Sequence, residues 1–239
     1  MTPQSPALVV DSLTVGYGSG PNVIESVNLN LAAGNLCCLL GDNGAGKSTF
    51  LKAIAGLIPF RHGSIYVNGL DCRKSHTRVG YLPQDAEVDW RFPATVQDVV
   101  MMGRVRDLGW LRYPGREDQL TVERVMCDVC LQELREQPIT ELSSGQRRRV
   151  LLARTLAQGA DLLLWDEPFT GVDLDTRQEL CQTLIQLNQA GFAMIVSSHA
   201  YDAFALPYES AILLNSGELH FGETEAILAL GRERREPVH

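Results

Sequence analysis

The sequence predicts an α/β fold with a mostly parallel sheet, and two observations support this prediction. Apolar segments of strand length, such as residues 36–40 and 162–165, alternate with helical segments in the first and last thirds of the chain. Strands separated by helices form βαβ units, whose strands lie parallel in one sheet. A mostly helical stretch, about residues 85–158, interrupts the alternation. We therefore expect one core that carries a helical insertion.

The composition is that of a globular protein. Hydrophobic residues make up 45% of the 239, and 21 Lys and Arg stand against 29 Asp and Glu, a formal net charge of −8. No apolar run approaches the roughly 18–20 residues that span a bilayer. Residues 1–46 contain no Lys or Arg to form the basic start of a secretory signal. We expect neither a transmembrane nor an exported protein. The acidic balance disfavours nucleic-acid binding through overall charge, although a local basic patch would still permit it.

The first third of the chain is rich in predicted strands, which Gly and Asn separate. One helix interrupts them. It begins in a glycine-rich loop, covers about Lys47–Ala55 and ends at Gly56, a residue suited to the position after a helix. The predicted strands are residues 7–17, 23–31, 36–40, 63–67 and 79–82.

Capping boxes mark two helices in the middle stretch. Thr95 and Asp98 form one before residues 96–103. Ser143 and Gln146 form the other, before a helix that runs to Ala157.

The last third returns to alternating strands and helices. A strand over residues 161–165 precedes a helix that ends at Gly191, and a second strand follows over residues 192–197. A hairpin around residues 215–217 and a charged C-terminal helix complete the predicted elements.

The strongest chemical signal is a glycine-rich loop between a strand and a helix. Glycines let backbone N–H groups converge on phosphate oxygens, and the N-terminus of a helix favours negative charge. We expect Lys47 to neutralise the β- and γ-phosphates and the Ser48 hydroxyl to ligate Mg²⁺. The loop predicts a nucleotide site. It fills the pattern G-x-x-x-x-G-K-[ST] with Gly41, Asp42, Asn43, Gly44, Ala45, Gly46, Lys47 and Ser48.

Two adjacent carboxylates, Asp166 and Glu167, follow the apolar strand 162–165. The carboxyl end of a buried strand is where parallel sheets bind ligands. Adjacent residues of a strand point in opposite directions, so we expect separate roles. Asp166 would hold Mg²⁺, and Glu167 would orient or deprotonate the attacking water. Together with the glycine loop, this pair predicts a P-loop nucleoside triphosphatase.

A pentapeptide that opens a helix narrows this class. Leu142, Ser143, Ser144, Gly145 and Gln146 resemble the signature Leu-Ser-Gly-Gly-Gln of the ATP-binding cassette (ABC) ATPases, with Ser144 in place of the first glycine. The resemblance implies a loop that contacts the γ-phosphate of the ATP bound by the opposite subunit. If position 144 needs a positive φ, serine costs more there than glycine.

Four further positions match the family in the right order, and the resemblance implies their roles. Tyr17 corresponds to the aromatic residue that stacks on adenine, and Gln84 to the glutamine that contacts Mg²⁺ or water. His199 corresponds to the switch histidine that contacts the γ-phosphate. Asp173 corresponds to the D-loop aspartate, although residues 170–173 depart from the commoner Ser-Ala-Leu-Asp.

The resemblance also implies the architecture and the full set of site residues. A RecA-like P-loop core with an N-terminal antiparallel β subdomain would cover residues 1–84 and 159–239, and a helical signature subdomain would cover residues 85–158, within one ABC ATPase domain. The expected catalytic residues are Glu167, His199 and Gln84, and the expected Mg²⁺ ligands are Ser48, Gln84 and Asp166. The expected ATP-binding residues are Tyr17, Gly41, Asp42, Asn43, Gly44, Ala45, Gly46, Lys47, Ser48 and Thr49.

A narrower match covers residues 88–104. They are similar to the branch of ABC ATPases that serves bacterial zinc, manganese and chelated-iron importers. In that branch this region helps to form the groove for the coupling helix of the permease, and exposed Trp90 and Phe92 would anchor such a helix. The alternative is that both aromatic side chains pack inside the lobe. For Arg147–Arg149, directly after the signature, we expect a solvated helix face. The alternatives are a contact to the opposite subunit or to anionic lipid headgroups near the membrane.

The resulting hypothesis is an ATP-binding and ATP-hydrolysing subunit of a divalent-metal importer. The resemblance implies a homodimer with ATP and Mg²⁺ between the chains, bound to integral membrane permease subunits at the cytoplasmic face of the cell membrane. An extracytoplasmic metal-binding protein would deliver the metal, and no nucleic acid is expected. Two alternatives remain: a soluble ABC ATPase that clamps nucleic acid or ribosomes, and the ATPase subunit of a transporter for another substrate, such as an exporter.

Overall fold

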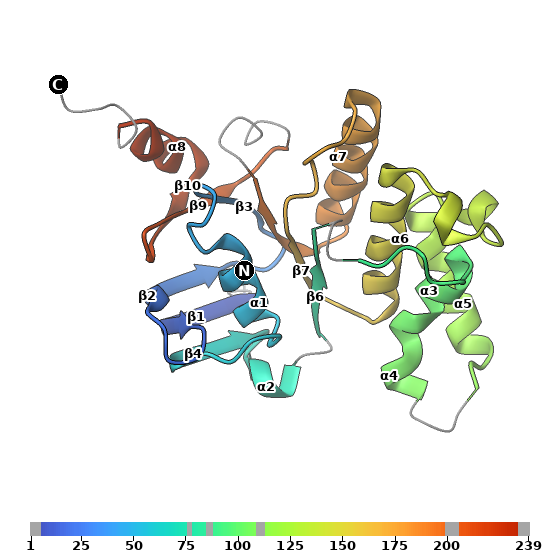
Figure 1. The fold of residues 1–239 in the computed structure, drawn as a ribbon, viewed down its shortest axis with the longest axis horizontal. Coiled ribbons are helices and arrows are strands. Elements are labelled where there is room, and N and C mark those ends of the chain that lie inside the picture. Colours follow the sequence, from blue (N-terminus) through green and yellow to red (C-terminus); the bar gives the residue numbers. More distant parts are fainter. Residues whose placement is uncertain (1–5, 76–77, 85–87, 109–112, 199–205, 234–239) are drawn as a thin grey trace, which may run out of the picture.

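A six-stranded sheet forms the centre of the molecule (Figure 1). The computed structural model describes residues 6–75, 78–84, 88–108, 113–198 and 206–233. The strand order is β10-β9-β3-β8-β7-β6; five strands are parallel, and β10 pairs antiparallel with β9 at one edge. This arrangement confirms the predicted α/β class. The strands are β3 (Leu36–Leu40), β6 (Val79–Leu82), β7 (Leu162–Trp165), β8 (Ala193–Ser197), β9 (Ser210–Asn215) and β10 (Glu218–Glu223).

A second, antiparallel sheet contains the N-terminal strands. Its order is β2-β1-β4-β5, and buried side chains alternate with exposed ones along much of β2, as expected for a sheet with one solvated face. The β1–β2 register shifts after Val10, where Ser12 has a φ of 48°. The strands are β1 (Leu8–Gly16), β2 (Asn22–Leu31), β4 (His62–Val67) and β5 (Leu70–Asp71).

Four helices form one group, called the helical group below. In Figure 1, α3, α4, α5 and α6 gather beside β6, on the side of the central sheet away from β1, β2 and β4. Within the described ranges, no helix is both long enough and apolar enough to cross a membrane. The helices are α1 (Lys47–Ile54), α2 (Cys72–Ser75), α3 (Val96–Met101), α4 (Val105–Leu108), α5 (Arg116–Asp128), α6 (Ser144–Ala157), α7 (Leu174–Gln189) and α8 (Thr224–Glu233).

The five parallel strands of the central sheet are largely buried on both faces, and successive residues of each of them pack into different cores. In β3, Leu36, Cys38 and Leu40 pack into a cluster with helices α3, α5, α6 and α7, while Cys37 and Leu39 pack into a cluster with α1 and the antiparallel sheet. This double burial explains why the strand is an uninterrupted apolar run in the sequence. Burial also raises the pKa of the Cys37 thiol to about 12.

The capped helices begin where the sequence predicts. Thr95 accepts a hydrogen bond from the Asp98 backbone N–H, and the Asp98 carboxylate accepts from the backbone N–H of Thr95. The helix predicted to run to Gly103 is shorter: α3 ends at Met101, and residues 102–104 continue as a 3-10 turn. Close packing accounts for glycine there, because a Cβ on Gly103 would lie 2.2 Å from the carbonyl oxygen of Arg154 in α6.

Candidate nucleotide site

The predicted site residues meet at one edge of the central sheet. The glycine loop follows β3, Gln84 follows β6, and Asp166 follows β7. Ser197 is the last residue of β8, which lies between β3 and β7. All four strands are parallel, so their carboxyl ends share this edge.

The glycine loop is shaped by close contacts with neighbouring strands. A Cβ on Gly41 would lie 2.5 Å from the carbonyl oxygen of Leu214, and one on Gly46 would lie 2.8 Å from the Val23 side chain. Gly46 also has a φ of 100°, which side chains rarely adopt, and it directly precedes α1. The loop can hold this path only with glycine at these positions.

Lys47 lies across the loop that precedes it. Its ammonium nitrogen Nζ donates to the carbonyl oxygens of Gly41, at 2.8 Å, and Asp42, at 3.2 Å. Its side chain is only 5% exposed. A nearly buried ammonium therefore sits against the concave side of the loop, where it can meet an anion.

Asp166 is held by hydrogen bonds from two strands. It is 2% exposed, and its Oδ1 accepts from the Ser197 hydroxyl at 2.7 Å. The Tyr81 hydroxyl donates to Oδ2 at 3.3 Å, and the Asp166 backbone N–H donates to Leu82. These bonds fix the carboxylate at the junction of β6, β7 and β8.

Glu167 adopts a backbone conformation that the sequence does not predict. We expected it to continue the strand with Asp166 on the opposite face, but β7 ends at Trp165 and Glu167 has a φ of 49°. This left-handed conformation is strained for a residue with a side chain. The Glu167 backbone N–H donates to the Ser197 hydroxyl at 2.8 Å, which holds the turn in place. The two carboxylates differ in environment because of this turn and not because of strand alternation.

The Glu167 carboxylate faces the glycine loop and the end of β6. Its Oε2 accepts from Gln84 Nε2 and from the Thr170 hydroxyl, each at 3.2 Å. Its Oε1 lies 4.0 Å from Lys47 Nζ. The structure thus brings together three predicted site residues from separate segments: Lys47, Gln84 and Glu167.

Tyr17 lies at the mouth of the site, next to the first helix. Its side chain is 55% exposed, and its hydroxyl lies 3.1 Å from the Thr49 hydroxyl in α1. The loop after Tyr17 is held by Arg61, a residue that carried no signal in the sequence. The Arg61 guanidinium donates to the carbonyl oxygens of Gly18 and Gly20 and to the Asn22 side chain, at 2.6 to 2.9 Å.

The signature residues 142–146 begin α6, away from this cluster. Ser143 caps the helix and forms a capping box with Gln146. Ser144 is the first helical residue and has no positive φ, so serine carries no backbone penalty there. Gly145 is required by packing, because a Cβ on it would lie 2.3 Å from the Thr176 side chain in α7.

Asp173 caps α7 close to the same contact. It accepts from the backbone N–H of Thr176 at 2.9 Å and from its hydroxyl at 2.8 Å. The first of these bonds has the larger effect in lowering the pKa of the Asp173 carboxyl. Thr176 therefore connects the cap of α7 to Gly145 at the start of α6.

The three arginines after the signature do not form a solvated face. Arg148 is 6% exposed and donates to the Thr170 carbonyl oxygen at 2.7 Å. Arg149 pairs with Glu179 at 3.2 Å, and the Arg147 guanidinium stacks over the Trp90 ring, 5.3 Å from its centroid. The prediction is wrong because α6 packs between α7 and the segment around Trp90, which gives each arginine a partner.

Trp90 also differs from its predicted exposure, whereas Phe92 agrees with it. Trp90 is 8% exposed and belongs to the core of the helical group, and Phe92 is 56% exposed. Both line one groove of about 510 Å³, with Arg91, Pro93 and Met102 among the other lining residues. Because Trp90 is nearly buried, of these two aromatic residues Phe92 is the one exposed enough to anchor a partner.

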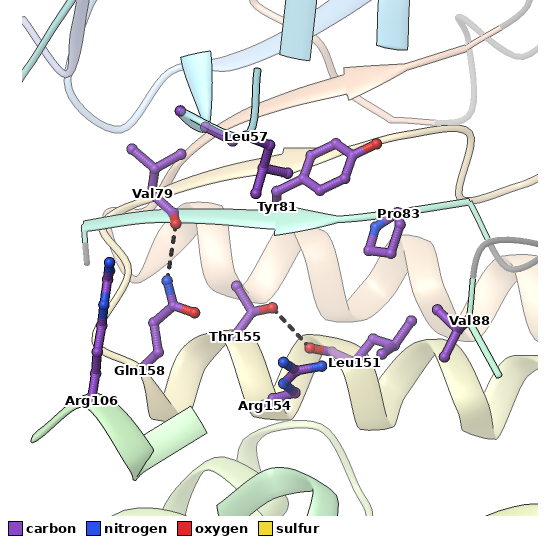
Figure 2. A pocket seen from close by; sticks show the side chains of 12 residues that line it. Leu57, Val79, Tyr81, Pro83, Val88, Arg106, Leu151, Arg154, Thr155 and Gln158 are labelled. Atoms are coloured by element: carbon purple, nitrogen blue, oxygen red, sulfur yellow. Dashed lines mark hydrogen bonds between the residues drawn. The ribbon is translucent and has the colours of Figure 1, made fainter. Parts of the chain in front are cut away.

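A second cavity of about 510 Å³ adjoins this groove and is lined by side chains of β6 and α6 (Figure 2). The two share Val88, Leu151 and Arg154. Its lining combines the exposed Leu57 with side chains of β6 and α6, and Gln158 closes one end by donating to the carbonyl oxygen of Val79 at 2.9 Å. Below, the groove and the adjoining cavity together are called the depression.

His199, the expected switch histidine, lies outside the described residues. Ser197 and Ser198, which precede it in the sequence, lie at the carboxyl edge of the sheet. The backbone N–H of Ser198 donates to Leu39 at 3.0 Å.

Comparison with known proteins identifies the family. Residues 24–170 match the ABC transporter family. The chelated-iron transport system membrane protein YfeB of Yersinia pestis is 41% identical, over 92% of this chain and 75% of its own length. The manganese transport system ATP-binding protein MntB of Bacillus subtilis is 37% identical, over 92% and 88%.

A solved structure agrees with these relatives. A metal-chelate type ABC transporter in an inward-facing conformation matches with a TM-score of 0.82 and 30% identity, over 93% of this chain and 85% of that one. The chain belongs to the ABC transporter family, and it is an ATPase of that family.

Proposed function

We propose that two copies of this chain bind ATP between them and hydrolyse it to drive a permease that imports divalent metal. The observation that carries the nucleotide part is the meeting of Lys47, Gln84 and Glu167 at the carboxyl edge of the sheet. Residues 41–49 and Tyr17 would bind ATP in one copy. Residues 142–146 of the other copy would close over the γ-phosphate, and Asp173 would lie at the contact between copies. Hydrolysis needs a positioned water and neutralised charge more than covalent chemistry.

The oxygen-rich groups at the sheet edge suit Mg²⁺ as the accompanying ion. Ser48 offers a hydroxyl, Asp166 a carboxylate and Gln84 an amide oxygen, and hard oxygen ligands are what Mg²⁺ prefers. The fit is supported by the Gln84 contact, because its amide nitrogen donates to Glu167 and the amide oxygen is the atom left to accept a metal. Bound Mg²⁺ would neutralise phosphate charge, while Glu167 would orient the attacking water and His199 would contact the γ-phosphate.

Metal import is the substrate class that the relatives favour. The names of the relatives YfeB and MntB refer to chelated iron and manganese, and both relatives match most of this chain. Within the chain, the segment 88–104 resembles the zinc, manganese and chelated-iron branch. An extracytoplasmic metal-binding protein would supply the permease, and this chain would act from the cytoplasmic face of the membrane.

The depression formed by the groove and the adjoining cavity is the proposed docking site for the permease. It exposes Phe92 and Leu57 and contains the guanidinium groups of Arg106 and Arg154. An amphipathic helix with an apolar face and an acidic residue would fit this combination. We place the cytoplasmic coupling helix of the permease here.

Replacing Phe92 or Leu57 with Asp is expected to remove the permease from the complex and to leave ATP hydrolysis by the isolated chain unchanged. Both side chains are more than half exposed, so the change affects the docking surface and not the core. Leu120→Asp on α5 is the matched control, because Leu120 is 54% exposed and lies outside both cavities. Co-purification with the permease is measured by mass spectrometry. If the Phe92 and Leu57 variants still retained the permease, the docking site would lie elsewhere.

Arg61→Ala is expected to weaken ATP binding several-fold and to leave the binding of inorganic triphosphate unchanged. Arg61 makes three hydrogen bonds to the loop behind Tyr17, and without them the adenine platform loses its fixed position. Tyr17→Ala serves as the comparison, because it removes the platform itself. Isothermal titration calorimetry with both ligands measures the difference, and equal weakening of ATP and triphosphate would contradict a role confined to adenine.

The whole proposal is tested by purifying the Glu167→Gln variant with ATP from gently solubilised source cells. Blocked hydrolysis is expected to hold the closed, partner-bound state. A multi-span membrane protein in the complex, together with loss of metal uptake in cells that lack it, would support the importer. Ribosomes or DNA in place of a membrane protein would overturn it in favour of a soluble clamp.

A further inference from the structure

Arg148 reaches from the signature helix to the loop that carries Glu167. It is the fifth residue of α6, is 6% exposed, and its Nη2 donates to the carbonyl oxygen of Thr170 at 2.7 Å. Burial of a guanidinium is costly unless its donors are used. The Arg148 guanidinium donates to the backbone three residues after Glu167, so a side chain of α6 holds the loop.

Thr170 carries the contact onward to the carboxylate. Its hydroxyl donates to Glu167 Oε2 at 3.2 Å, and its backbone N–H donates to the Glu167 carbonyl oxygen at 3.3 Å. A single residue therefore accepts from Arg148 and donates to Glu167. Phe169, between these two residues in the sequence, is buried. The Arg177 guanidinium of α7 lies 5.2 Å from the centroid of the Phe169 ring, and this contact holds the turn against α7.

The turn needs such support because Glu167 is strained. Its φ of 49° persists only when surrounding contacts hold it. On one side Ser197 binds the Glu167 backbone N–H, and on the other Thr170 and Gln84 bind the carboxylate. Of these contacts, only the Thr170 contact leads to α6.

We propose that Arg148 and Thr170 are positioning residues that hold the Glu167 carboxylate in its productive orientation. The inference rests on the proposed function, in which Glu167 orients the attacking water. Its consequence is that the helix whose first turn serves the ATP of the opposite copy also aligns the carboxylate of its own site. Neither residue contacts ATP in this arrangement; both act through Glu167.

Thr170→Val tests the hydroxyl. Valine keeps the shape of threonine, and Thr170 is exposed, so the fold is expected to remain intact. We expect kcat to fall about tenfold with KM for ATP within about twofold, because a hydrogen bond to a charged group is lost but no ATP contact is. Thr170→Ser restores the hydroxyl and is expected to restore kcat. Full turnover by Thr170→Val would overturn the proposal.

Arg148→Met tests the other end of the connection, since it removes the guanidinium but keeps an apolar stem of similar length. We expect it to lower kcat by a similar factor. Should this variant fail to fold, as judged by its thermal melt, the Thr170 series alone decides.

A double-mutant comparison separates positioning from general structural damage. In the Glu167→Gln background, adding Thr170→Val is expected to cause no further loss of the residual rate, because the group it positions is already gone. A full additional tenfold loss would show that Thr170 acts by another route and would overturn the proposal. Failure of the proposed function has a different signature, namely undiminished turnover by Glu167→Gln alone.

Discussion

Glu167→Gln is expected to lower the rate of ATP hydrolysis by roughly 10²–10⁴-fold while ATP still binds. The substitution removes the negative charge and the basic site but keeps the side-chain shape. The amide oxygen of glutamine can accept the bonds that Gln84 and Thr170 now donate, so the turn after β7 is retained. ATP affinity is expected to hold or rise, because a carboxylate near the bound phosphates repels them.

Phosphate release under saturating ATP measures the rate, and calorimetry measures the affinity. Glu218→Gln is the matched control, since Glu218 lies on β10 at the far edge of the sheet and is exposed. If Glu167→Gln turned over ATP as fast as Glu218→Gln, Glu167 would have no catalytic role, and another group would have to orient the attacking water.

The nucleotide loop could be predicted because its signals are contiguous. The apolar strand before Gly41, the glycine spacing and the helix after Gly46 are all local, and each is set by backbone geometry that the residues themselves impose. The same holds for the capping boxes at Thr95 and Ser143, where donor and acceptor lie three residues apart.

The environments of Trp90 and Arg148 could not be predicted, because their partners are distant in sequence. The partner of Trp90 is Arg147, and Arg148 contacts Thr170, 22 residues away. A triplet of arginines on a helix is typical of a solvated face, and only the packing of α6 against α7 reverses this. Exposure is a property of the tertiary arrangement, which sequence periodicity alone does not determine.

The order of the strands in the central sheet could not be predicted from the sequence either. Alternation of strands and helices indicates a parallel sheet, yet β3 lies between β8 and β9 and not beside its neighbours in the chain. That order is what brings the end of β3 next to the end of β8. The roles of Lys47 and Glu167 follow from local motifs, but their 4.0 Å separation follows from this topology.

Lys47→Ala is expected to abolish measurable ATP binding, a loss of affinity of at least about 10²-fold. The ammonium is nearly buried against the loop, and without a ligand it is held by the carbonyl oxygens of Gly41 and Asp42. Its removal takes away the cation that we propose neutralises the β- and γ-phosphates. Because the ammonium is poorly solvated, its attraction to a phosphate is stronger than that of a water molecule that could take its place.

Calorimetry with ATP distinguishes this loss from a general effect on α1. Lys52→Ala, five residues further along the same helix, removes the same charge outside the loop and is expected to keep ATP binding. A thermal melt of each variant checks that the fold remains. Unchanged affinity in Lys47→Ala would contradict the role assigned to the Lys47 charge in binding the phosphates. Loss of ATP binding in both variants would instead indicate an effect on α1 as a whole. The contrast between the Lys47 and Lys52 variants therefore tests whether the Lys47 charge itself binds the nucleotide.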